Sequence, residues 1–207
     1  MINSWNKIIY RIWSPVYDKV FNAGLFLNAR KEIFRKITLL PEHKILFVGV
    51  GTGADLELID YEKFNITAID FSADMLVKAK AKDRNGTVKF FEMDAQDMGF
   101  DDQSFDFVFA HLILSVVPDA PRCFREMERL LKPNGVMVIF DKFAPDNKAL
   151  PFHKRLLRPI ISVLGTDIGI AFKAIFEEHG RTLTLQEDSP IMLNGMYRKI
   201  VLRKAMN

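Results

Sequence analysis

The stretch Ile45-Leu-Phe-Val-Gly-Val-Gly-Thr-Gly-Ala54 decides the fold of this 207-residue chain. Its first four residues are apolar and predict a strand that is buried on both faces. The glycines that follow let the backbone turn tightly, so that a ligand can approach without meeting a Cβ atom. Asp70 closes a second apolar run, 66–69. If the two strands are parallel neighbours, its carboxylate lies at the same sheet edge as the glycines and can accept hydrogen bonds from ribose hydroxyls.

The glycine turn alone does not choose a cofactor. Gly49-x-Gly51-x-x-Ala54 also satisfies the dinucleotide-binding pattern with alanine in its last place. The rest of the chain alternates strand-like and helix-like segments, which predicts an α/β fold with a mostly parallel sheet and right-handed crossovers. We expect strands near 44–49, 65–70, 87–92, 105–110, 135–141, 182–186 and 196–202. We expect helices near 22–39, 54–60, 72–83 and 119–131, after two short helices at the N-terminus.

Five ordered motifs carry a family resemblance. They are the glycine turn, the run ending in Asp70, Phe90-Phe-Glu-Met-Asp94-Ala-Gln-Asp97-Met, Ser104-Phe-Asp-Phe-Val-Phe-Ala110, and Leu130-Leu-Lys-Pro-Asn-Gly135 with the strand after it. This order resembles that of the class I S-adenosylmethionine (SAM) methyltransferases over most of the chain from Ile45 to Leu202. The resemblance implies a Rossmann-like, seven-stranded sheet, mostly parallel with the last strand antiparallel, and helices on both faces. It also implies SAM as the cofactor and S-adenosylhomocysteine as its product.

The resemblance assigns cofactor contacts to three groups of residues. The turn after the first strand lies under the methionine part, the second strand's end binds the ribose, and the turn after the third strand meets the adenine. Carried over, these residues are Gly49, Gly51, Thr52 and Gly53, then Asp70 with Phe71 and Met75, then Asp94 with Ala95. His111 ends the fourth strand beside the methionine pocket, where it can touch the cofactor or catalyse. The family usually has an acid two places before the first glycine, but Phe47 stands there, so the usual anchor for the methionine amino group is missing.

The N-terminal stretch Trp13-Ser-Pro-Val-Tyr17-Asp18-Lys-Val-Phe21-Asn-Ala-Gly24, with Arg30 further on, carries a second, local resemblance. It looks like the N-terminal element of bacterial phosphatidylethanolamine N-methyltransferases and the related quinone C-methyltransferases. This implies that Tyr17 faces the methyl-transfer site as the catalytic residue and that the first helix lies on a membrane surface. The apolar residues of this element can instead cover the sheet edge, and Tyr17 can be an ordinary packed tyrosine.

Length and composition favour one domain over 1–207, with an N-terminal helical cap at 1–43 and a helical, substrate-side insertion at 142–179. A single cysteine, Cys123, and four scattered histidines give no metal-ligand spacing, so we expect no metal. No secretory leader and no run of about 18 apolar residues is found, which predicts a cytoplasmic protein.

Charge is distributed unevenly along the chain. Residues 1–44 hold eight Lys and Arg against three Asp and Glu, and 142–207 hold eleven against six, whereas 45–141 hold ten against seventeen. An acidic centre suits a cationic sulfonium cofactor, while the basic flanks favour an anionic substrate or the inner face of an anionic membrane. We therefore expect a small-molecule or lipid-like substrate, and the N-terminal resemblance implies a phospholipid headgroup or a quinone precursor. Nucleic acid is not expected, because His111-Leu-Ile-Leu-Ser-Val-Val-Pro118 stands where amino-methylating DNA enzymes carry Asn/Asp-Pro-Pro-aromatic.

Two alternatives remain open on sequence grounds. An NAD-dependent oxidoreductase can use the same glycine turn with Asp70 on the adenosine ribose, although no Tyr-x-x-x-Lys pair is found. A non-catalytic SAM-binding protein is compatible with Phe47.

Overall fold

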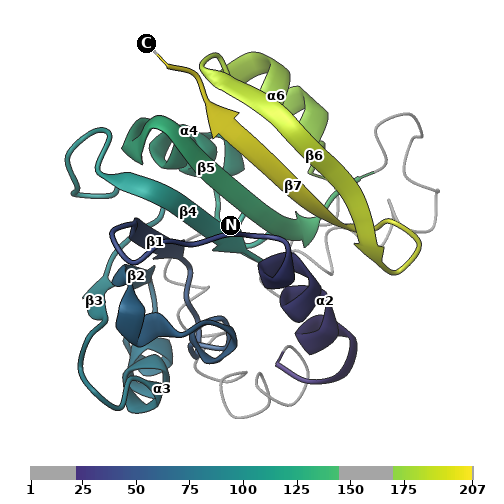
Figure 1. The fold of residues 1–207 in the computed structure, drawn as a ribbon. Coiled ribbons are helices and arrows are strands. Elements are labelled where there is room, and N and C mark those ends of the chain that lie inside the picture. The colour runs from purple at the N-terminus through teal and green to yellow at the C-terminus, as the bar shows by residue number, and fades with distance from the viewer. Residues whose placement is uncertain (1–21, 145–169, 207) are drawn as a thin grey trace.

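The computed structural model describes residues 22–144 and 170–206. Within them, seven strands form one sheet in the order β3-β2-β1-β4-β5-β7-β6 (Figure 1). The strands are β1 (Lys44–Val48), β2 (Asn65–Asp70), β3 (Lys89–Glu92), β4 (Phe105–His111), β5 (Leu131–Lys142), β6 (Leu183–Met192) and β7 (Tyr197–Lys204). The first five are parallel, and β7 runs antiparallel between β5 and β6. The predicted fold, mostly parallel with an antiparallel last strand, is confirmed.

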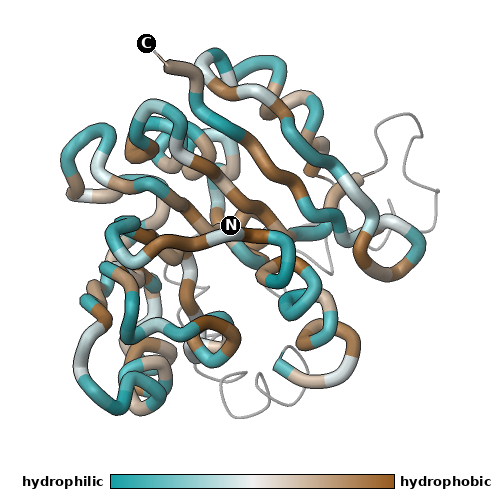
Figure 2. The backbone as a smooth tube through the Cα atoms, in the orientation of Figure 1, coloured by the Kyte–Doolittle hydropathy of each residue, from teal (hydrophilic) through white to brown (hydrophobic). Residues whose placement is uncertain are grey.

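Helices cover both faces of this sheet. They are α2 (Gly24–Arg35), α3 (Ala73–Lys82), α4 (Ala120–Leu130) and α6 (Phe172–His179), with two 3₁₀ turns, η1 (Leu56–Leu58) and η2 (Tyr61–Lys63). One apolar cluster lies between the strands and α4 with α6, and a second lies between the strands and α2 with α3. Hydrophobic residues accordingly follow the central strands, while hydrophilic ones gather at loops and outer surfaces (Figure 2).

The sheet register brings the turns of three strands to one edge. Val48 at the end of β1 pairs with Ile69 of β2 on one side and with Ala110 of β4 on the other. The glycine turn, Asp70 and the loop after His111 therefore leave the sheet side by side. In parallel sheets this carboxyl edge is where ligands bind.

Two helix predictions differ from the structure. The helix expected over 54–60 is wrong, because this segment forms only the short turn η1; the carboxylate of Asp55 is buried against Arg30 and His111 instead of starting a regular helix. The helix expected over 22–39 is shorter, since α2 ends at Arg35, where Ile37 closes a tight turn by donating to the Phe34 carbonyl. Beyond it, β-branched Ile37 and Thr38 disfavour another helical turn.

Gly53 explains how closely α3 approaches the glycine turn. Its φ of +79° lies in the left-handed region, and a Cβ there would stand 3.1 Å from the Cα and 3.2 Å from the Cβ of Ala79 in α3. The missing side chain thus serves the packing of a helix against the turn.

We predict that Gly53→Ala lowers the free energy of unfolding by about 1–3 kcal/mol, because it combines backbone strain with this close contact. Gly86→Ala also places a side chain at positive φ, but with no atom within 4 Å of the added Cβ, so it measures the backbone strain alone. Gly99→Ala has neither feature and serves as the reference. Urea unfolding of the three variants measures the difference. Equal stabilities for Gly53→Ala and Gly86→Ala would contradict the packing argument.

Candidate functional site

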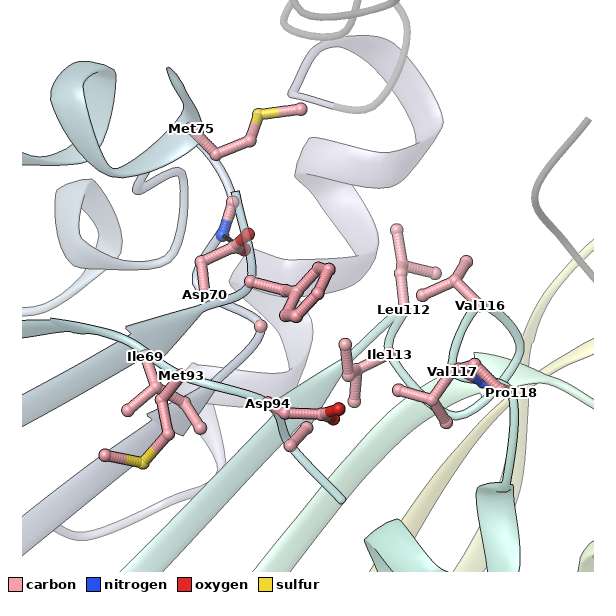
Figure 3. A pocket seen from close by; sticks show the side chains of 14 residues that line it. Ile69, Asp70, Met75, Met93, Asp94, Leu112, Ile113, Val116, Val117 and Pro118 are labelled. Atoms are coloured by element: carbon pink, nitrogen blue, oxygen red, sulfur yellow. Dashed lines mark hydrogen bonds between the residues drawn. The ribbon is translucent and has the colours of Figure 1, made fainter. Parts of the chain in front are cut away.

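A pocket opens at the carboxyl edge of β1, β2, β3 and β4 (Figure 3). Asp70 and Met75 lie on one side, Asp94 and Met93 at the base, and the residues after β4 on the opposite side. The lining residues are Gly49, Gly51, Ile69, Asp70, Phe71, Met75, Met93, Asp94, Ala95, Leu112, Ile113, Val116, Val117 and Pro118. The site thus combines two carboxylates with a largely apolar wall.

Asp70 joins the two turns that flank the pocket. Its Oδ2 accepts a hydrogen bond from the Gly51 N–H at 2.8 Å, and its Oδ1 accepts one from the Ser72 N–H at 2.8 Å. Burial raises the pKa of this carboxyl to about 6, although the N–H groups of Ser72, Gly51 and Phe71 oppose the rise. A carboxylate oxygen can accept two or more hydrogen bonds, and each oxygen of Asp70 accepts one from the backbone. Asp70 therefore retains acceptor capacity for a ligand while holding the backbone in place.

Asp94 is fixed from behind by a glutamine. The Gln96 side-chain amide donates to both Asp94 oxygens, at 2.9 and 3.1 Å, and the Gln96 N–H donates to Oδ1 at 2.9 Å. The Gln96 side-chain oxygen accepts from the Asp119 N–H, and Asp119 in turn caps α4 by accepting from the Arg122 N–H. The orientation of the second pocket carboxylate is thus tied to the start of a helix.

The apolar wall comes from the loop after β4. Ile113 approaches the glycine turn so closely that a Cβ on Gly49 would stand 2.6 Å from its Cδ1. Beneath the loop, the buried Asp141 accepts from the Ser115 N–H at 3.0 Å and from the Lys142 N–H at 2.8 Å. Burial raises the pKa of Asp141, against the effect of the Ser115 and Lys142 donors.

A further buried carboxylate, that of Asp55, lies behind the glycine turn. Asp55 Oδ1 lies 3.2 Å from Arg30 Nε, and its Oδ2 lies 3.0 Å from His111 Nδ1. Burial opposes ionisation, but His111 and Arg30 hold the pKa of Asp55 below its ordinary value. Arg30 also donates to Asn22, which donates to the Thr52 hydroxyl. These contacts join α2, the glycine turn and the end of β4.

The predicted site residues fall into three groups. Those that line the pocket are Gly49, Gly51, Asp70, Phe71, Met75, Asp94 and Ala95. Thr52, Gly53 and His111 lie behind the turn rather than among the lining residues, with Thr52 and His111 side chains buried in the network just described. Tyr17 lies outside the described residues, as do most of the predicted cap and 145–169 of the predicted insertion.

Sequence reasoning missed the wall formed by Leu112, Ile113, Val116, Val117 and Pro118. The sequence did contain one indication of this wall. These residues directly follow the fourth strand, and the carboxyl end of that strand lies at the same sheet edge as Gly49. The pairing of Asp55 with Arg30 and His111, and of Asp141 with Ser115, joins residues distant in the sequence and has no local signal.

The sequence of this chain is similar to those of known methyltransferases. Residues 46–139 match the model of a methyltransferase domain. A phosphatidylethanolamine N-methyltransferase of Cereibacter sphaeroides is 32% identical over 192 residues, 91% of this chain and 92% of the relative. The chain belongs to the SAM-dependent methyltransferases.

Other similarities agree with this family. A demethylmenaquinone methyltransferase of Listeria welshimeri is 28% identical over 84% of this chain and 76% of the relative. The fold matches that of a SAM-dependent methyltransferase from Mesorhizobium loti with a TM-score of 0.71 and 17% identity, over 87% of this chain and all of that one. The NAD-dependent oxidoreductase receives no support from these similarities.

The pocket of this methyltransferase fits SAM in two observed respects. Asp70 offers a carboxylate beside the glycine turn, as a ribose requires. Gly49 and Gly51 both line the pocket, and a Cβ on Gly49 would collide with Ile113 in the pocket wall. Among the described residues, no cluster of three or more His, Cys, Asp or Glu is arranged to hold a metal ion. Within the same residues, no helix has the length and apolar character needed to cross a membrane.

We predict that SAM affinity depends on the ionisation of Asp70. The carboxylate must be charged to accept from the ribose, and its pKa is about 6, so the dissociation constant rises as the pH falls below about 6 and is constant above 7. In Asp70→Asn the amide oxygen accepts from only one of the two backbone N–H groups. The variant should therefore bind SAM about 10- to 100-fold more weakly, and its affinity should no longer depend on pH in this way.

Calorimetric titration from pH 5 to 8 measures both effects. The exposed Asp101→Asn is the matched control and should bind as the wild type does. Parallel pH profiles for wild type and Asp70→Asn would contradict the role of this carboxylate.

We also predict that Asp55→Asn lowers the free energy of unfolding by about 3–5 kcal/mol at pH 7, because it leaves Arg30 buried beside a neutral group. The folded state depresses the pKa of Asp55, so its contribution is complete above the ordinary value of 3.8 and is lost as the pH falls below it. Urea unfolding at several pH values measures this. Asp60→Asn, at an exposed pair with Lys63, should change little; equal losses in the two variants would refute the prediction.

Proposed function

We propose that this methyltransferase transfers a methyl group from SAM to the amine of an ethanolamine phospholipid headgroup. The observation that carries the proposal is the similarity to a relative named phosphatidylethanolamine N-methyltransferase, which extends over almost the whole length of both chains. An apolar wall on one side of the pocket is consistent with an acceptor that has lipid character.

We assign cofactor contacts to the lining residues by the family pattern. Asp70 accepts from the ribose, Phe71 and Met75 pack on the adenosine, and Asp94 with Ala95 meets the adenine. Gly49 and Gly51 let the backbone lie against the methionine part. Thr52, Gly53 and His111 hold the turn in place from behind, which is supported by the buried contacts of Thr52 and His111 and by the packing of Gly53 on α3.

SAM, when bound, supplies an electrophilic methyl group, and the chain's own task is to align the acceptor and exclude water. Such positioning supplies about 7–11 kcal/mol of the barrier reduction. The apolar residues after β4 keep water from that side of the pocket. An ammonium acceptor must lose a proton before it attacks, and we propose Tyr17 as the residue that faces it.

A second candidate is a demethylated quinone as the acceptor. It is favoured by the similarity to a relative named demethylmenaquinone methyltransferase over 84% of this chain. This acceptor would also meet the apolar wall, but its methylated atom is a carbon.

We also propose where the enzyme works in the cell. We infer a single domain over 1–207 that works in the cytoplasm at the inner face of the membrane, where the basic flanks 1–44 and 142–207 meet anionic lipid. Such contact weakens with salt.

Methyl-labelled SAM with mixed micelles tests the acceptor. We predict label in mono- and further methylated phosphatidylethanolamine with the wild type, and none with phosphatidylcholine, whose amine is already fully methylated. Asp70→Asn should lose this activity at low SAM concentration. Reduced demethylmenaquinone is assayed in parallel, and label in the quinone alone would replace the first candidate by the second. SAM binding with turnover of neither acceptor would refute both.

A further inference from the structure

The loop after β4 contains a strained residue at the pocket. Leu112 has a φ of +58°, in the left-handed region that favours glycine or asparagine over a bulky side chain. Among the non-glycine residues with positive φ in the described parts of the chain, it is the one that lines the pocket. Strain of this kind persists only where the surroundings enforce it, and it concentrates at functional sites.

Two buried carboxylates enforce the conformation from both sides. Before Leu112, the His111 ring lies against Asp55 and packs on Phe34 and Phe140 at centroid distances of 5.6 and 5.8 Å. After it, Asp141 accepts from the Ser115 N–H.

The Leu112 N–H itself donates to the Phe140 carbonyl at 2.7 Å. The chain between residues 111 and 115 is therefore fixed at both ends, and the turn between them directs Leu112 into the pocket (Figure 3).

The position of Leu112 relative to the cofactor follows from strand order. Asp94 follows β3, Asp70 ends β2 and Gly49 follows β1, and these strands are successive neighbours in the sheet. A cofactor that contacts all three lies across β3, β2 and β1, with its methionine end at Gly49. The next strand is β4, so Leu112 lies beyond the methyl-donating end, on the side from which an acceptor must approach.

We propose that Leu112 is a specificity-determining residue that contacts the apolar part of the methyl acceptor, and that Asp55 and Asp141 are positioning residues that hold it there. This inference rests on the proposed function. The Leu112 side chain packs in part on the apolar cluster under α2 and α3 and in part lines the pocket, so the strained turn presents the remaining apolar surface to a ligand.

Leu112→Asn tests the side chain without adding strain, because asparagine has nearly the same shape and tolerates positive φ. Leu193→Asn is the matched control: it has a φ of +52° and lies 51% exposed between β6 and β7, away from the pocket. Leu193→Asn should melt at or above the wild-type temperature, whereas Leu112→Asn should melt below it because it loses packing on the apolar cluster under α2 and α3; both should bind SAM within about twofold of the wild type. Leu112→Asn alone should raise the acceptor KM about tenfold, since a polar group replaces an apolar contact.

Two results would overturn the proposal. A rise in the SAM dissociation constant of Leu112→Asn that matches the rise in acceptor KM would make Leu112 a cofactor contact. An unchanged acceptor KM would leave it without a role in acceptor binding. If the wild type binds SAM but methylates neither lipid nor quinone, the proposed acceptors fail, and the SAM titration still decides whether Leu112 belongs to the cofactor wall.

A double-mutant cycle tests the positioning role of Asp141. Asp141→Asn should raise the acceptor KM with SAM affinity unchanged, but it should add nothing in a Leu112→Gly background, where no side chain remains to be positioned. Additive effects on the acceptor KM would show that Asp141 acts independently of Leu112.

Discussion

The carboxylate of Asp70 is the constraint on which the cofactor pocket depends. It accepts from Gly51 on one side and Ser72 on the other, so a single side chain sets the distance between the turn after β1 and the start of α3. The Ser72 hydroxyl in turn caps α3 through the Met75 N–H. Because these partners are backbone groups, the pocket is formed without help from a ligand, and binding needs little ordering of this side of the site.

Asp55, Asp70 and Asp141 show how partners decide the charge of a buried acid. Contacts with His111 and Arg30 favour the ionised form of Asp55, whereas Asp70 and Asp141 are stabilised mainly by neutral donors that do not fully offset burial. Asp55 therefore stays ionised above its ordinary pKa and links α2 to the end of β4 through Arg30 and His111. The pKa values of Asp70 and Asp141 are raised, so these two carboxyls gain a proton at a higher pH. Of these two residues, Asp70 lines the pocket, where a change in its charge affects a ligand directly.

The sequence allowed the sheet to be predicted because its central strands are short apolar runs that end in glycine or acid, a local pattern with a direct structural meaning. Gly49, Asp70 and Asp94 were found in this way. The segment after Ala54 was mispredicted as a helix because its conformation depends on Asp55 meeting Arg30 and His111, which are far apart in the chain. The strain at Leu112 escapes prediction for the same reason, since leucine gives no sign of positive φ.

Phe47 illustrates how the family's missing acid is accommodated. It pairs with Phe109 across β1 and β4, stacks on that ring at 5.1 Å, and is 1% exposed beneath Phe34. His111 follows Phe109 by two residues and so points to the same sheet face. The buried acid on this face is Asp55, which comes from the turn and pairs with His111 behind the pocket rather than lining it. An acid at position 47 would be buried among aromatic rings at a large desolvation cost, so the phenylalanine belongs to the packing that supports the Asp55 network.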